Sequence, residues 1–312
     1  MSREIAQYAL ACAPPWWARG GHAQTIFGHL VANPAPNLAR AERREIAVSD
    51  GDVVVVRTLA GTSGVRVHLL HGLSGDADSD YVRGAGEGSG RAKRPYHSGS
   101  TADLAAVLAA SRAEAPERVH VVIGFSISGN IVLLHAAQRL APRADGVIAV
   151  NPPVDLARSA DQLHRGRNRL YELRFVRRLA RAIRVYEAAG VVRATGPIGT
   201  FASLRTLDDR FTAPVSGFAG AVDYYARCSS GPRLGEIDVP AVIVTSADDP
   251  LVDVEMVRSA ARGSGVFVHV EEHGGHMGYL SGAAPRHWLD GALVHYVAEL
   301  ARIARNAAVR VG

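Results

Sequence analysis

The sequence reads VHVVIGFSISGN from Val119 to Asn130. Its apolar, β-branched first half predicts a buried strand, and the apolar run from Ile131 to Ala137 predicts a helix. A sharp turn between strand and helix, with a serine between small residues, is the setting of a nucleophile elbow. Ser126 is therefore the candidate nucleophile. The Ile127 N–H, at the start of the helix, is a candidate oxyanion-hole donor.

This pattern departs from G-x-S-x-G at one position, because Ser128 stands where the second glycine is usual and Gly129 follows it. Serine is small enough for a tight turn, and Gly124 lets the backbone fold back without a Cβ. A buried strand capped by a polar turn would give a similar pattern, so this motif alone leaves a purely structural interpretation open.

Composition indicates a soluble globular protein with a large core. The chain has 312 residues, of which 47% are hydrophobic and 21% charged, enough for one large α/β domain or two ordinary ones. The net charge is +5, but Lys93 is the only lysine among 35 basic residues. Such an arginine bias suggests GC-rich coding rather than a nucleic-acid partner, and we expect none.

Cysteine content and the N-terminus bear on the compartment. Cys12 and Cys228 are too few and too far apart for a disulfide framework or a zinc site, which favours a reducing compartment. The apolar stretch from Ile5 to Cys12 makes a poor signal peptide and is too short to span a bilayer. We therefore expect a cytoplasmic protein.

Alternation of strands and helices predicts an α/β fold, a mostly parallel sheet covered by helices on both faces. A capping box at Ser100 predicts a helix to about Ala115, and an amphipathic helix is expected over about Arg286–Arg305. Asp50-Gly51-Asp52 predicts a hairpin turn. The expected strands are Arg44–Ser49, Val53–Leu59, Val65–Leu70, 119–123, Gly146–Val150, Ala241–Thr245 and Val266–Val270.

Three segments depart from this alternation. Residues 1–43 read as an irregular arm whose Trp16-Trp17 pair anchors it to the domain, or else lines the mouth of a site. Residues 75–99 form an unusually long run with no strand or helix pattern. Residues 154–235 read as a helical cap insertion within one 312-residue domain.

The cap contains nine arginines between Arg158 and Arg184, interleaved with apolar residues at helical spacing. A solvated arginine face on a packed helix is the plainer interpretation. A basic cap over an acyl or anionic substrate, or a weak contact with a membrane surface, is the functional one.

Two further residues complete a candidate catalytic constellation. Asp249 follows the expected strand 241–245, and His276 lies among glycines after the last strand, giving the order Ser…Asp…His of α/β-hydrolases. Such an acid holds the histidine in one tautomer. Asp248 is the alternative acid, and Asp155 a more distant one.

The strand 65–70 ends in His71-Gly72-Leu73, where α/β-hydrolases form the second half of the oxyanion hole. The Leu73 N–H is the candidate donor, and His71 is interpreted as structural. His273 and His276 also invite a metal interpretation, but there is no third ligand cluster, so we expect neither metal nor cofactor.

At this point the chain resembles the YheT-like α/β-hydrolases, relatives of medium-chain acyl esterases and phospholipases. The resemblance implies Ser126 as nucleophile, Asp249 as orienting acid and His276 as base, acting on esters of short or medium acyl chains. It covers most of the chain, from about residue 16 to residue 290. The motifs that carry it are Gly21–Ile26, His71–Gly75, Tyr81–Arg83, Pro95–Gly99, Gly124–Asn130, Asp223–Tyr225, Ala247–Pro250 and Gly274–His276.

One departure from the family concerns the sheet. Family members carry a helix and a strand after the Tyr-x-Arg motif, whereas here Tyr81-Val82-Arg83 runs almost directly into glycines. Without that strand, the N-terminal hairpin either pairs directly with Val65–Leu70 or leaves the sheet split. Oxyanion geometry near Leu73 would be affected first.

The sequence thus predicts a serine hydrolase whose partner is a small-molecule acyl ester. An acyltransferase that uses an alcohol in place of water is one alternative. A non-catalytic protein of the same fold that binds an acyl ligand is the other. No sequence signal points to an oligomeric state.

Overall fold

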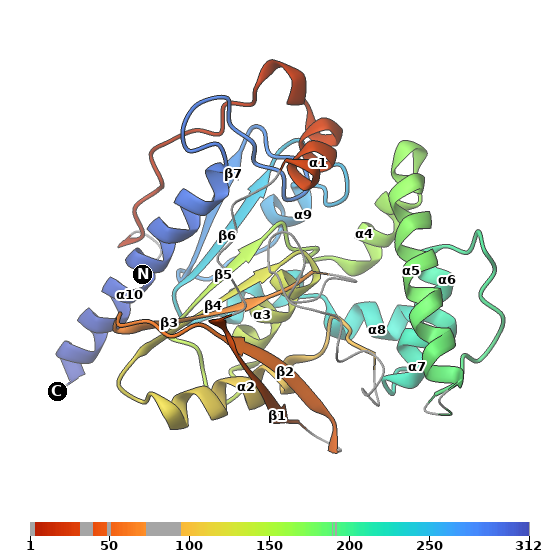
Figure 1. Ribbon diagram of the computed structural model, residues 1–312, viewed down its shortest axis with the longest axis horizontal. Helices are drawn as coiled ribbons and strands as arrows, with labels where there is room; N and C mark the ends of the chain where they lie inside the picture. The colour runs from red at the N-terminus through yellow and green to blue at the C-terminus, as the bar shows by residue number, and fades with distance from the viewer. Residues whose placement is uncertain are drawn as a thin grey trace.

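The computed structural model describes residues 4–31, 40–48, 51–72, 95–188, 190 and 192–311. Its core is a five-stranded parallel sheet in the order β3-β4-β5-β6-β7, flanked by helices (Figure 1). The strands are β3 (Val65–Leu70), β4 (Val119–Phe125), β5 (Gly146–Val150), β6 (Ala241–Ser246) and β7 (Val266–Glu271). The predicted α/β fold with a mostly parallel sheet is confirmed.

The two N-terminal strands form a separate sheet. β1 (Glu42–Ala47) pairs antiparallel with β2 (Val53–Thr58), as the hairpin signal predicted, with Ala47 opposite Val53. Of the two expected arrangements, the structure has the split sheet. Within the described residues, β3 therefore pairs only with β4, and its Val67 and Leu69 remain 41% and 49% exposed.

The remaining elements follow the chain from the arm to the C-terminus. The α-helices are α1 (Gly21–Leu30), α2 (Thr101–Glu114), α3 (Ile127–Gln138), α4 (Leu156–Leu163), α5 (Arg169–Ala188), α6 (Leu204–Leu207), α7 (Ala213–Val215), α8 (Ala221–Cys228), α9 (Glu255–Arg258) and α10 (Trp288–Val311). Short helical turns are η2 (Trp16–Ala18), η5 (Gly166–Asn168), η6 (Asp208–Thr212) and η7 (Gly231–Glu236).

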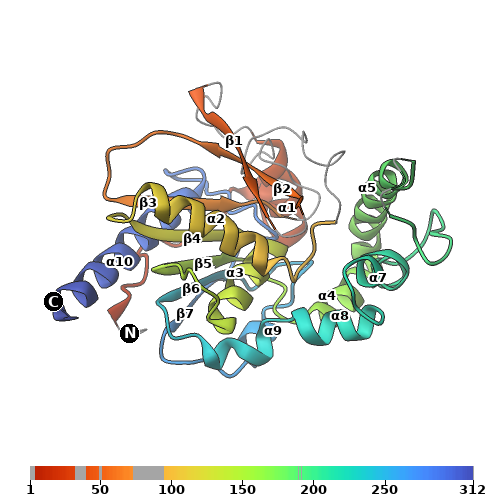
Figure 2. The same cartoon turned by 90° about the horizontal axis from the view of Figure 1, so that it is seen from below.

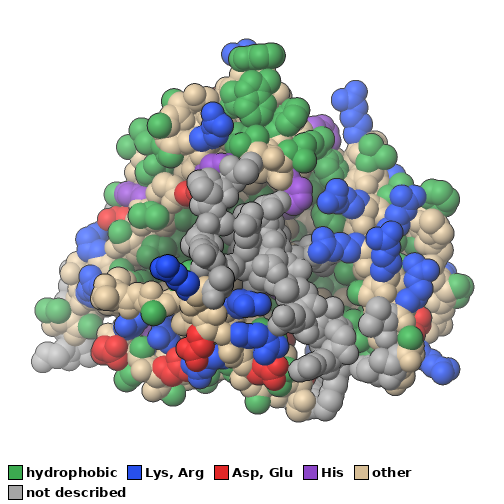
Figure 3. Space-filling model, viewed as in Figure 1, with side chains coloured by type: hydrophobic (Ala, Val, Ile, Leu, Met, Phe, Trp, Pro, Cys, Tyr) green, Lys and Arg blue, Asp and Glu red, His purple; other side chains and the backbone are tan. Residues whose placement is uncertain are grey.

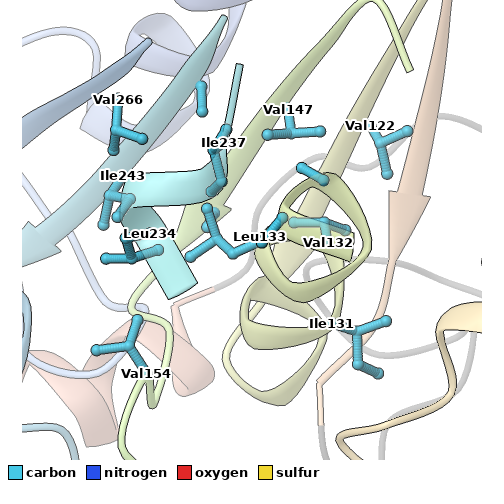
Figure 4. Packing of buried hydrophobic residues seen from close by; sticks show 14 of the residues in the cluster. Val122, Ile131, Val132, Leu133, Val147, Val154, Leu234, Ile237, Ile243 and Val266 are labelled. Carbon is cyan, nitrogen blue, oxygen red and sulfur yellow. The ribbon is translucent and has the colours of Figure 1, made fainter. Parts of the chain in front are cut away.

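Two apolar layers cover the sheet, because successive strand residues point to opposite faces. On one face Val122, Val147 and Ile243 pack against α2, α3 and η7, with Ile131 and Leu133 of α3 fully buried (Figure 4). On the other face, strand residues such as Val121, Ile148 and Val242 pack against α10 and the N-terminal arm. Figure 2 shows α2 and α3 on one side of the sheet and α10 on the other.

The expectation of an irregular arm over residues 1–43 is wrong in part, because α1 is a ten-residue helix. Its sequence has four glycine or histidine positions and no acidic residue near its start, so its intrinsic propensity is low. Close packing stabilises it instead: an added Cβ on Gly28 would lie 2.3 Å from the Cα of Gly278. Tertiary contact thus overrides local preference.

Helices α4 to α8 all lie within residues 154–235, the segment predicted as a cap, and stand beside the sheet at the right of Figure 1. Because β4 to β7 are parallel, their carboxyl ends meet at one edge of the sheet. The loops after these strands carry the candidate residues.

Candidate active site

Ser126 lies between β4 and α3 in a backbone conformation that few residues adopt. Its φ is 54° and its ψ is −119°, and its N–H donates to the Val150 carbonyl at 2.8 Å. Positive φ in a residue other than glycine costs free energy and marks functional turns. Gly124 is required here, because a Cβ at that position would lie 2.2 Å from the Ser128 carbonyl oxygen.

A continuous chain of hydrogen bonds links the three predicted residues. His276 Nε2 lies 3.0 Å from Ser126 Oγ, and His276 Nδ1 lies 2.8 Å from Asp249 Oδ2. A carboxylate oxygen accepts, so Nδ1 carries the proton and Nε2 is left as an acceptor for the Ser126 hydroxyl. The structure therefore brings together residues separated by up to 150 positions in the sequence.

Asp249 is buried, and four donors fix its carboxylate. Oδ2 also accepts from Asn151 Nδ2 at 2.7 Å, while Oδ1 accepts the N–H groups of Leu251 at 2.8 Å and Val252 at 3.1 Å. Rotation of the carboxylate would break several of these bonds at once. His276 thus meets an acceptor whose position is set by the loops after β5 and β6.

Asn151 was not predicted as part of this site. It follows β5 at a φ of 46°, which asparagine tolerates better than most residues. Its Oδ1 accepts from the buried Tyr279 hydroxyl at 2.8 Å, so the amide is held with its nitrogen toward Asp249. In the sequence, Asn151 is marked only by the Asn-Pro-Pro motif at the end of a strand. That motif does not distinguish a turn residue from one that holds the Asp249 carboxylate.

The alternative acids have other partners. Asp248 Oδ1 accepts the Gly274 and Gly275 N–H groups at 3.0 and 2.8 Å, which fixes the loop that carries His276. Asp155 caps α4 by accepting the Arg158 N–H at 3.0 Å. The geometry therefore favours Asp249 over both.

Helix α1 holds the histidine loop from outside. Thr25 Oγ1 accepts the His276 N–H at 2.8 Å, and the fully buried Gln24 side chain bonds both the N–H and the carbonyl of Leu280. The Cβ that Gly275 lacks would lie 2.4 Å from the Gly21 carbonyl oxygen. The arm is thus anchored by α1 to the loop beside the site. The predicted anchor, the Trp16-Trp17 pair, is instead 80% and 38% exposed.

The arm also contacts the cap. His22 of α1 stacks on Tyr171 of α5 with ring centroids 5.8 Å apart, and its Nδ1 lies 3.1 Å from the Tyr171 hydroxyl. Burial, with a smaller contribution from the negative charge of Asp249, raises the pKa of Tyr171. The first turn of α5 therefore lies close to the three predicted residues, so the arm also borders the site.

The oxyanion side of the site is described in part. Ile127 begins α3, and the next residue, Ser128, is fully buried. Its hydroxyl donates to the His71 carbonyl and accepts from Tyr96, whose oxygen is 2.6 Å away. The serine that replaces glycine therefore ties the end of β3 to the elbow. Leu73, the other predicted donor, lies outside the described residues.

Contacts within the described chain show the surroundings of His71, His273 and His276. His71 Nδ1 donates to the Gly72 carbonyl at 2.9 Å, in keeping with the structural assignment. His273 lies 3.4 Å from Asp248, whereas His276 faces Asp249 and Ser126. No cluster of three or more histidine, cysteine or acidic residues in the described chain could hold a metal ion.

A membrane-spanning helix is also missing from the described part of the chain: none of its helices combines the length and the apolar character needed to cross a bilayer.

The chain is similar to known proteins in both sequence and fold. A family model described as the alpha/beta hydrolase fold matches residues 82–283. YheT of Escherichia coli (strain K12) is 28% identical over 304 residues, which cover 87% of this chain and 88% of YheT. The monoacylglycerol lipase ABHD2 of Danio rerio is 24% identical over 333 residues, covering 91% and 76%.

A solved structure shares the fold: the esterase Pf2001 of Pyrococcus furiosus superposes with a TM-score of 0.53 at 14% identity, covering 88% of this chain and 97% of that one. The likeness to YheT confirms the resemblance inferred from the motifs. Because the family model matches well over half of this chain, and because the sheet has the parallel topology described above, the chain belongs to the α/β hydrolase family.

Proposed function

We propose that the protein is a serine hydrolase that cleaves carboxylic esters of short or medium acyl chains. Ser126 is the nucleophile, His276 the general base and Asp249 the acid that orients it. The observation that carries the proposal is the unbroken run of hydrogen bonds from Asp249 through His276 to Ser126 Oγ. The name of the relative ABHD2, a monoacylglycerol lipase, supports an acyl ester as substrate.

The reaction begins when His276 Nε2 takes the Ser126 proton as Oγ attacks the ester carbonyl. The imidazolium that forms is stabilised by the Asp249 carboxylate, 2.8 Å from Nδ1. It then gives its proton to the departing alcohol. Water, activated by the same Nε2, attacks the acyl-enzyme and releases the acid, which returns Ser126 to its starting state.

Charge on the carbonyl oxygen needs donors that are already in place. The Ile127 N–H is one of them. Ile127 is the first residue of α3, and the N–H groups of the first turn have no partner within the helix. We assign the second to the Leu73 N–H. The Ser128–His71 hydrogen bond supports this assignment, because it joins the end of β3 to the first turn of α3.

The test is turnover of p-nitrophenyl esters of increasing chain length by the full chain. Ser126→Ala, His276→Ala and Asp249→Ala should each lower kcat, the first two by about 10⁴–10⁶-fold. Retention of most activity in Ser126→Ala would overturn the proposal. A control at the exposed Ser259, which directly follows α9, should leave turnover unchanged when changed to alanine (Ser259→Ala).

Two measurements separate the alternatives. A fluorophosphonate probe should label wild-type protein and not Ser126→Ala, whereas a non-catalytic acyl-binding protein would not be labelled at all. Added ethanol should leave the free acid as the main product. Conversion mostly to the ethyl ester would instead identify an acyltransferase.

A further inference from the structure

The outer side of α5 is a basic face, formed by Arg174, Arg177, Arg178, Arg181 and Arg184. All five side chains are exposed, and their spacing of three and four residues places them on one side of the helix. At a rise of about 1.5 Å per residue, the face is about 15 Å long. Figure 3 shows basic side chains gathered over this part of the molecule.

No acidic side chain in the described chain neutralises this face. None of its five arginines forms an ion pair there, although several exposed arginines elsewhere do, such as Arg258 with Glu255. The two acidic residues of α5 are engaged otherwise: Glu172 is fully buried beside Arg169, and Glu187 accepts the Ala194 N–H. Like charges at this spacing destabilise a helix, so the face is arranged for an anion from outside.

Exposed apolar side chains lie at the start of the same helix. Leu170 is 73% exposed and Phe201 is 70% exposed. They belong to adjacent segments, because Arg169 Nη2 donates to the Phe201 carbonyl at 2.5 Å. A basic face that ends in exposed apolar side chains has the composition of a surface that rests on lipid headgroups.

A hollow beside the face points the same way. It has a volume of about 230 Å³ and lies between α5 and residues 194–200. Its lining is mixed: Val176, Ile183 and Ile198 are among the apolar residues, and the polar ones are Arg177, Arg184, Glu187 and Thr200. Apolar lining next to guanidinium groups suits an amphipathic anion better than it suits a nucleic-acid backbone, which offers phosphates without an apolar part.

We propose that the basic face of α5, with Leu170 and Phe201, docks the protein on an anionic lipid surface. The arginines attract the phosphate-bearing headgroups, and the two apolar side chains enter the boundary between headgroups and acyl chains. The buried residues of α5 stay in the protein, so docking needs no unfolding of the helix. This inference goes beyond the proposed function and does not depend on it.

The test is co-sedimentation of the full chain with vesicles. Wild-type protein should bind vesicles of phosphatidylcholine mixed with phosphatidylglycerol, should not bind phosphatidylcholine alone, and should be released by salt. The triple change Arg174→Gln/Arg178→Gln/Arg181→Gln should weaken binding by about fivefold per arginine, about a hundredfold in all. Leu170→Ser/Phe201→Ser should weaken binding at low salt while leaving its release by salt unchanged.

The matched control is Arg233→Gln/Arg258→Gln/Arg302→Gln, which removes the same charge from ion-paired arginines elsewhere at the surface. Its binding should stay close to that of the wild type. Equal loss in both triple variants would overturn the proposal, since net charge alone would then explain binding. Failure of wild type to bind anionic vesicles, or tighter binding to double-stranded DNA or RNA at the same salt, would also overturn it.

The same variants are checked for folding by turnover of a soluble p-nitrophenyl ester. We expect both triple variants to match the wild type in kcat, because none of the substituted arginines contacts the candidate active site. Vesicle binding is measured with no ester present, so the two proposals are tested separately. A failure to bind vesicles does not contradict the proposed ester hydrolysis, and a loss of ester turnover does not contradict the proposed docking.

Discussion

Replacing Gly124 with alanine should distort the turn between β4 and α3 while leaving Ser126, Asp249 and His276 chemically unchanged. The added Cβ would lie 2.2 Å from the Ser128 carbonyl oxygen and 2.5 Å from the carbonyl carbon, both in the first turn of α3. Ordinary van der Waals contact begins at 3.4 Å, so β4 and α3 must separate by about 1.2 Å. Ser126 lies between them and must move with this separation.

A misplacement of about 1 Å costs about 10²-fold in rate, because the reacting atoms no longer meet in a near-attack geometry. We therefore expect kcat of Gly124→Ala to fall by about 10²-fold on a p-nitrophenyl ester. Overpacking should also lower the free energy of unfolding by about 1–3 kcal/mol, measured by urea denaturation.

The matched control is Gly61→Ala, since nothing lies within 4 Å of a Cβ built on Gly61 and its φ is not in the left-handed region. That variant should keep wild-type kcat. If Gly124→Ala also kept wild-type kcat, the elbow would accommodate a Cβ without moving Ser126, and the geometric reasoning would be refuted.

Three further predictions concern residues around the site and one buried histidine. Asn151→Gly keeps the positive φ accessible but removes the donor to Asp249. We expect the free energy of unfolding to fall by about 1.5–3 kcal/mol and kcat to fall by up to about tenfold with KM unchanged. A loss of stability without any change in kcat would contradict a positioning role. Thr25→Val removes the acceptor of the His276 N–H and should lower kcat by about fivefold, whereas Thr25→Ser should restore it; equal kcat in all three proteins would refute the clamp by α1. Burial lowers the pKa of His135 to about 4, and its Nε2 has no hydrogen-bond partner in the described chain. His135 takes up a proton near pH 6.5 in the unfolded chain but only near pH 4 in the folded chain, so the free energy of unfolding should fall by about 3 kcal/mol as pH drops through that window. His135→Leu should reduce the fall in the urea midpoint between pH 7 and pH 4. An equal fall in the variant and the wild type would show that His135 does not contribute.

The strands and the three side chains of the candidate site could be predicted because their signals are local. Each buried strand is a short apolar run, and each candidate residue directly follows one, so a parallel sheet places them at one edge. Ser126, Asp249 and His276 each carry such a signal. Their order along the chain then restricts the fold to very few choices.

Residues that support the site could not be found in this way. Thr25 and Asn151 act through partners far along the chain: Thr25 meets His276 across 251 positions, and Asn151 meets Tyr279 across 128. Helix α1 was missed for the same reason, since its weak propensity is compensated only by packing on the histidine loop. The split sheet could be foreseen only as one of two arrangements.

The anchoring of α1 has a consequence for the order in which the protein matures. Synthesis proceeds from the N-terminus, so Thr25 and Gln24 leave the ribosome long before residues 276 and 280, to which they bond across 251 and 256 positions. Contacts of such long separation form late in folding, because closing a large loop costs entropy before it gains contacts. We expect a nascent chain to expose Ser126 well before it can hydrolyse an ester, with activity arising only after residues 276 to 280 leave the exit tunnel.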